Sequence, residues 1–253
     1  MEPVCRPGTA LTAAAVIGVA VALSLRSLAK VRVDDAVSAA GSALIGPRIR
    51  VWYRAALEPA EEWLAANGWS PDALTYAQLA LSVLAGWAYA TACVFLGGCL
   101  VMTAGTLDIL DGGLARRRGV PGARGALVDS IADRWAEFAT FVGLGALYRD
   151  GWMLVVVALA AFGSQMVSYV RARAEGLGLA MATGRAQRPE RYVLLGFGSV
   201  LSGLVGHLTC VATGRPGHGI LSACLVVLAA VSVWTAVERA SHAAAALGRD
   251  GTP

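Results

Sequence analysis

The sequence predicts an all-α protein, a polytopic bundle of membrane helices. Composition is the first reason: 57% of the 253 residues are hydrophobic, apart from 30 glycines, and only 15% are charged. Soluble domains hold about 45–50% apolar residues with glycine included, and disordered chains hold fewer. Second, the apolar residues gather in runs of about 20, the length that crosses a bilayer. Third, small residues dominate these runs, which lets membrane helices pack closely.

The first apolar run covers residues 9–29 and is followed by Lys30 and Arg32. A secretory signal peptide carries its positive charges before the run and a small-residue cleavage site after it. We therefore expect residues 1–30 to form a retained extra N-terminal span, with a cleaved signal peptide as the alternative.

Residues 31–70 have a different character, because charged side chains alternate there with aromatic and aliphatic ones. Such a pattern is typical of an amphipathic helix that lies on the membrane surface. Ser70 and Pro71 follow as a helix N-cap and first helical residue, so a new helix is expected from this point.

Residues 71–245 are expected to form one core domain of six transmembrane helices. Glycine-containing segments such as Gly97-Gly98 supply the breaks between them. The six expected helices cover residues 72–96, 99–118, 125–147, 152–170, 192–213 and 218–237.

The charges indicate how the chain lies in the membrane. If the N-terminus is outside, most of the 21 lysines and arginines fall on one side of the bilayer. Loop bases accumulate on the cytoplasmic side, so we expect a multi-pass protein of the cell membrane with that side in the cytoplasm. The basic residues of these loops account for the net charge of +4, so no nucleic-acid partner is expected.

Four aspartates stand at the ends of two neighbouring apolar segments, where ionisable residues are costly and need a reason. Asp108 and Asp111 are three residues apart, and Asp129 and Asp133 are four apart, so each pair lies on one face of its helix. The short connection makes the helices antiparallel neighbours. The carboxylates would repel one another unless cations lay between them, and hard divalent ions prefer such oxygen ligands and bridge to phosphates. The expected cofactor is Mg²⁺ or Mn²⁺, as two ions that stabilise a displacement at phosphorus.

The same segment resembles the signature of a known family, the CDP-alcohol phosphotransferases, which reads D-x2-D-G-x2-A-R-x8-G-x3-D-x3-D. The turn from Ser70 to Thr75 is similar to the family's entry to its first core helix, and the resemblance covers about residues 65–245. The eight matching positions are Asp108, Asp111, Gly112, Ala115, Arg116, Gly125, Asp129 and Asp133.

The resemblance implies transfer of a phosphatidyl group from CDP-diacylglycerol to an alcohol, with release of CMP. It implies that Asp108, Asp111, Asp129 and Asp133 bind metal and that Asp133 is also the general base. Homodimers are expected in such a family. The residues implied to contact the CDP-lipid are Pro71, Thr75, Gly112, Ala115, Arg116 and Gly125.

A second basic cluster bears on the acceptor alcohol. Arg171, Arg188 and Arg191 lie on the expected cytoplasmic side and suit an acceptor that carries its own phosphate. Alternatively, they are ordinary loop bases that meet solvent or lipid headgroups. The segments around them are similar to stretches of phosphatidylinositol phosphate synthases, which implies inositol 1-phosphate as acceptor.

Two other functions fit the same residues. Glycerol 3-phosphate also carries a phosphate, so a phosphatidylglycerophosphate synthase is the main alternative. A non-catalytic divalent-cation carrier is a remote one, because a carrier would place its acids on both sides of the membrane midplane. Arg134 and Glu137, close to Asp133, are expected to form a structural ion pair inside the bundle.

Overall fold

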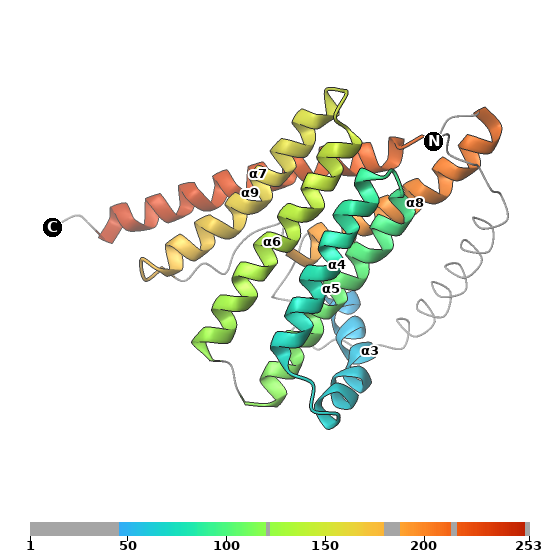
Figure 1. The fold of residues 1–253 in the computed structure, drawn as a ribbon. Helices are drawn as coiled ribbons and strands as arrows, with labels where there is room; N and C mark the ends of the chain where they lie inside the picture. The colour runs from blue at the N-terminus through green and yellow to red at the C-terminus, as the bar shows by residue number, and fades with distance from the viewer. Residues whose placement is uncertain (1–45, 120–121, 180–187, 214–216, 251–253) are drawn as a thin grey trace.

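The computed structural model describes residues 46–119, 122–179, 188–213 and 217–250, and this part of the chain is helical and contains no strand. The expected N-terminal span lies outside the described residues. Figure 1 shows the arrangement of the helices. Their bounds are α3 Pro47–Ala66, α4 Pro71–Ala90, α5 Val94–Arg117, α6 Ala123–Leu147, α7 Met153–Glu175, α8 Arg188–Thr213 and α9 Gly219–Asp250.

Three of the described helices are long and apolar enough to cross a membrane: α5, α7 and α9 over Gly219–Gly248. Many large apolar side chains remain exposed around the bundle, such as Trp135, Phe162 and Val237. A soluble protein rarely exposes so many large apolar side chains, whereas a lipid-facing surface requires them. A helical membrane protein is therefore confirmed for the residues that the structure describes.

Pairs of helices pack through small residues. α4 packs against α5 and α6, α5 against α8, and α7 against α9. Gly86 of α4 and Gly143 of α6 lie so close that a Cβ atom on either would collide with the backbone of the other helix. Gly163 of α7 brings that helix against Val233 of α9 in the same way. Close approach of this kind holds membrane helices together through van der Waals contact.

The break between α4 and α5 lies at residues 91–93, not at Gly97-Gly98 as the sequence predicted. Both glycines are inside α5. A Cβ on Gly97 would meet the ring of Tyr89 at 2.7 Å, and one on Gly98 would meet the backbone nitrogen of Val200 at 2.7 Å. These glycines therefore serve close packing, while the turn itself uses Ala92 with a positive φ of 60°.

Helix α9 runs to Asp250, well beyond the expected end at residue 237. Its extension contains the run Ala243 to Ala246, and alanine has the highest helix propensity of all residues.

The amphipathic helix α3 lies against α5 (Figure 1). Its apolar face packs Leu64 against Leu110 and Leu114 of α5. Arg117 at the end of α5 forms ion pairs with three acids on α3, which fixes α3 at the end of the bundle where α5 stops and α6 begins. The acids are Glu58, Glu61 and Glu62, at 3.2, 3.0 and 3.5 Å.

Candidate active site

The site lies at the end of the bundle where α4, α6 and α8 begin and where α5 ends. Helix α4 starts there because Ser70 caps it, its hydroxyl accepting a hydrogen bond from the Ala73 amide at 3.2 Å, and Pro71 takes the first position. The buried Thr75, one turn in, donates to the Pro71 carbonyl at 3.2 Å and to Asp111 Oδ2 at 2.9 Å. The start of α4 is thereby tied directly to the first pair of acids.

The two helices that carry the acids bring them together as their spacing predicts. One carboxylate oxygen from each of Asp108, Asp111 and Asp129 lies within 4.8 Å of the other two. Asp111 is buried, and the other two are partly buried. Three negative groups at this separation repel one another strongly in a partly desolvated site.

The carboxylate oxygens in this cluster suit a divalent cation as ligands. Oδ1 of Asp129 is buried and has no hydrogen-bond partner among the described residues, so an acceptor inside the cluster is left without a donor. Buried acceptors are rarely left unsatisfied. Carboxylate oxygens close together are the ligands that Mg²⁺ and Mn²⁺ take.

Asp133 lies one turn further along α6 and is held by two partners. Gln78 of α4, which is completely buried, donates from Nε2 to Oδ1 of Asp133 at 3.1 Å. Arg188 at the start of α8 contacts the other oxygen, Oδ2. Sequence reasoning missed Gln78, although a lone amide three residues after Thr75 in an apolar segment was a signal for it.

Space is left open above the acids by two glycines. A Cβ added to Gly125 would meet no described atom within 4 Å, and one added to Gly112 would meet only Nη1 of Arg116, at 3.3 Å. Ala115 is partly buried one turn after Gly112, and Arg116 is exposed. The surface beside the cluster is therefore lined by small residues and is accessible to a ligand that carries phosphate.

The three arginines of the second basic cluster lie in different environments. Arg171 is exposed at the end of α7 and pairs with Glu175 at 2.8 Å. Arg188 lies among the acids, with its Nη1 at 3.0 Å from Asp108 Oδ1. Arg191, one turn further along α8, is buried. The structure thus brings Arg188 to the carboxylate cluster and Arg191 close behind it.

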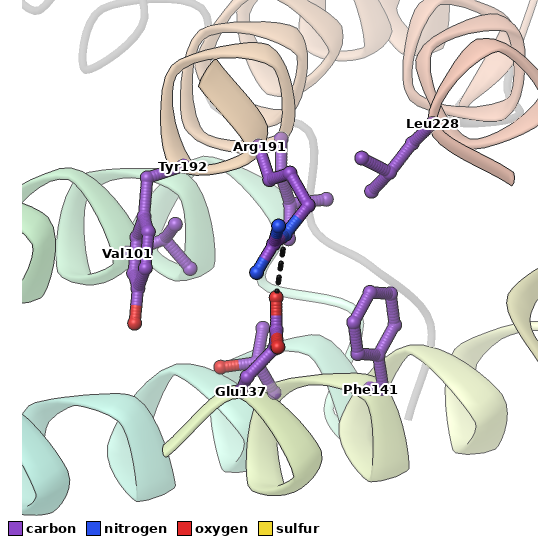
Figure 2. Close-up of a pocket in the computed structure, with 8 residues that line it drawn as sticks. Val101, Glu137, Phe141, Arg191, Tyr192 and Leu228 are labelled. Carbon is purple, nitrogen blue, oxygen red and sulfur yellow. Dashed lines mark hydrogen bonds and ion pairs between the residues drawn. The ribbon is translucent and has the colours of Figure 1, made fainter. Parts of the chain in front are cut away.

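Arg191 pairs with Glu137 of α6 at 3.0 Å (Figure 2). Figure 2 shows the two side chains reaching toward each other, with Phe141 and Leu228 beside them. Glu137 also accepts a hydrogen bond from Ser164 of α7 at 2.5 Å. The expected Arg134–Glu137 pair is not the one formed, since the Arg134 guanidinium donates to Ser130 instead.

Charged groups therefore face each other in register across α6 and α8. Asp129, Asp133 and Glu137 follow one face of α6 at intervals of four residues, and Arg188 and Arg191 follow one face of α8 at an interval of three. This row of opposite charges connects the aspartate cluster with the more deeply buried ion pair of Arg191 and Glu137.

A family model described as CDP-alcohol phosphatidyltransferase matches residues 69–234, which include all four aspartates and the three arginines. The chain belongs to this family. It is therefore a transferase, and the sequence resemblance is confirmed.

Curated relatives agree with this assignment. The chain is 35% identical to the archaetidylinositol phosphate synthase of Methanothermobacter thermautotrophicus, in an alignment that covers 66% of this chain and 80% of that protein. It is 37% identical to the phosphatidylinositol phosphate synthase of Mycobacteroides abscessus, in an alignment that covers 58% of this chain and 70% of that protein.

Solved structures of the phosphatidylinositol phosphate synthase of Mycobacterium tuberculosis share the fold. One, with CDP-DAG bound, matches with a TM-score of 0.61 at 30% identity over 73% of this chain and 92% of that one. Another, in complex with manganese and citrate, matches with a TM-score of 0.62 at 30% identity over 73% of this chain and 87% of that one.

Proposed function

We propose that this protein transfers the phosphatidyl group of CDP-diacylglycerol to inositol 1-phosphate and releases CMP. The observation that carries the proposal is the cluster of Asp108, Asp111 and Asp129 oxygens, with Asp133 beside it and Arg188 facing it from α8. Similarity to proteins named phosphatidylinositol phosphate synthase, one of them with CDP-DAG bound, supports the donor and the acceptor.

In this proposal Asp108, Asp111, Asp129 and Asp133 hold two divalent cations, Mg²⁺ or Mn²⁺. Bound there, the ions would neutralise the diphosphate of the donor and the charge that develops on the leaving CMP. The relative whose structure is in complex with manganese supports a divalent metal as the cofactor.

The reaction is a displacement at the phosphorus that carries diacylglycerol. The acceptor hydroxyl oxygen attacks this phosphorus, Asp133 takes the hydroxyl proton, and the bond from phosphorus to the bridging oxygen of CMP breaks. A hydroxyl is a weak nucleophile, so a carboxylate at the site of attack is required to remove the proton. Gln78 keeps Asp133 oriented through its 3.1 Å hydrogen bond.

The donor is assigned to the open side of the cluster. Gly112, Ala115 and Gly125 leave room for the diphosphate and cytidine, and the exposed guanidinium of Arg116 is available to phosphate. Pro71 and Thr75 form the turn that faces the nucleotide while Thr75 fixes Asp111.

The acceptor phosphate is assigned to Arg171, Arg188 and Arg191. Arg188 already lies at the acids, and Arg191 lies one turn behind it. Glycerol 3-phosphate would use the same charges, so phosphatidylglycerophosphate synthesis stays the alternative acceptor choice.

The proposed placement in the cell membrane follows the charges. Helices α4 to α9, within a core domain of residues 71–245, are taken as six core spans. Residues 31–70, which include α3, are taken as a surface segment and residues 1–30 as an additional span. The active site then faces the cytoplasm, where the arginines gather. A homodimer is the expected assembly.

The test is CMP release by purified protein from CDP-diacylglycerol and Mg²⁺ with four acceptors offered separately. We expect release with inositol 1-phosphate. Release with glycerol 3-phosphate alone would correct the acceptor and keep the chemistry. Release only with free inositol or serine would contradict the role of the arginines, and no release with any acceptor would contradict the proposed reaction.

A further inference from the structure

The side chain of Arg188 lies inside the carboxylate cluster. Its Nη1 atom is 3.0 Å from Asp108 Oδ1 and also contacts Asp133 Oδ2, so one guanidinium nitrogen bridges an acid of α5 and an acid of α6. All three side chains are at most 20% exposed. This is a partly buried, charge-assisted contact and not a loose surface pair.

Two features direct Arg188 to this position. It is the first residue of α8, so the helix fixes where its side chain starts. Tyr192, one turn later, lies under the guanidinium, with 5.5 Å between the Arg188 Cζ atom and the ring centroid. A cation over an aromatic face is attracted to it. Nη2 of Arg188 is buried and has no hydrogen-bond partner among the described residues, so the group has a donor to spare.

The cluster that Arg188 enters is the one assigned above to metal. Asp108 is shared, because its carboxylate belongs both to the group of three acids and to the contact with Arg188. A guanidinium and a divalent cation a few ångströms apart repel each other. Full ligation of an ion by Asp108 and Asp133 is therefore at odds with the position that Arg188 occupies.

We propose that Arg188 is the internal counter-ion of the metal-free site and competes with divalent cations for Asp108 and Asp133. This inference rests on the proposed metal site. Before metal binds, the guanidinium offsets part of the repulsion among the acids. Metal binding displaces it and leaves its donors free at the edge of the cluster, where the acceptor phosphate is assigned. Metal loading therefore precedes productive acceptor binding.

The test is the affinity of the purified full-length protein for Mn²⁺, measured from the electron paramagnetic resonance signal of free Mn²⁺ without any lipid or acceptor. Arg188→Gln removes the competing charge and should bind Mn²⁺ more tightly by about tenfold to a hundredfold, the range that hydrogen bonds between charged groups contribute. Arg188→Lys keeps the charge and should stay close to the unmodified protein.

The matched control is Arg118→Gln, which removes the same charge from an exposed side chain at the C-cap of α5. It should leave Mn²⁺ affinity nearly unchanged. If losing any positive charge were enough to tighten Mn²⁺ binding, the affinity would rise in both Arg118→Gln and Arg188→Gln. Thermal unfolding of each variant in detergent establishes that the proteins compared are folded. Arg188→Met, which also removes the charge and should also bind Mn²⁺ more tightly, replaces Arg188→Gln if that variant is unstable.

Equal Mn²⁺ affinity in the unmodified protein and Arg188→Gln would overturn the inference and leave the proposed function standing. Weaker binding by Arg188→Gln would overturn it too, because Arg188 would then support the site. Absence of Mn²⁺ binding in every variant would instead contradict the proposed metal site, which the inference needs.

Discussion

Replacing Arg191 by methionine tests how α8 is held on α6. The Glu137 and Arg191 side chains are only 10% and 5% exposed, and their pocket is lined largely by apolar residues that include Val101, Phe141 and Leu228. Arg191→Met would leave the Glu137 carboxylate buried, with the Ser164 hydroxyl as its remaining described donor. Removing one partner of a buried ion pair costs about 3–5 kcal/mol.

The assay is thermal unfolding in detergent combined with a double-mutant cycle. For a domain of this size about 3–5 kcal/mol corresponds to a fall of about 6–20 °C in Tm. Adding Glu137→Gln to Arg191→Met removes the stranded charge and should restore most of that loss. The coupling between the two positions is then the quantity measured.

Kinetics separate stability from function for the same variant. Arg191→Met should raise the KM for the acceptor more than the KM for CDP-diacylglycerol, because the arginine is assigned to the acceptor phosphate. Two results would contradict a stabilising buried pair of Arg191 and Glu137. One is a loss of stability below about 1 kcal/mol, typical of an exposed pair. The other is a double variant whose loss of stability equals the sum of the losses in the two single variants. An equal rise in both KM values would make Arg191 a structural residue only.

Three further predictions concern the acids and the packing. Asp133→Asn should lower turnover by about a hundredfold to ten-thousandfold, the range of general base catalysis, while CDP-lipid binding measured by calorimetry is largely spared; near-normal turnover would exclude Asp133 as the base. Asp111→Ala should abolish activity together with Mg²⁺ dependence, and an unchanged Mg²⁺ titration would exclude it as a ligand. Gly143→Ala should destabilise the protein by about 1–3 kcal/mol through overpacking against Gly86. Gly145→Ala is its control, because the added Cβ would lie at an ordinary 3.6 Å from Leu154, and equal Tm values for the two would contradict the packing argument.

The acid cluster could be predicted from sequence because its geometry is local. Spacings of three and four residues place the carboxylates on one face of each helix, and a short connection makes those helices neighbours. The structure brings Asp108, Asp111 and Asp129 together as this reasoning requires. A helix in the segment before Ser70 could also be predicted, because charged and apolar residues alternate there, and α3 lies in this segment.

The features that the sequence did not predict depend on contacts between segments far apart in the chain. Arg188 is 80 residues from Asp108, and nothing in the local pattern fixes how α8 docks on α5. The partner of Glu137 was misjudged for the same reason: Arg134 is near in sequence, but Arg191 reaches it from another helix. Gly97 and Gly98 were read as a break because glycine serves both turns and close packing, and only the neighbouring helices decide between the two.

The identity of the lipid product is the most direct test of the proposed function. Purified protein would be given CDP-diacylglycerol, Mg²⁺ and an equimolar mixture of inositol 1-phosphate and glycerol 3-phosphate, beside Asp133→Asn, and the lipids identified by mass spectrometry. We expect phosphatidylinositol phosphate as the main product and almost none of it from Asp133→Asn. Phosphatidylglycerophosphate as the main product, or undiminished product from Asp133→Asn, would contradict it.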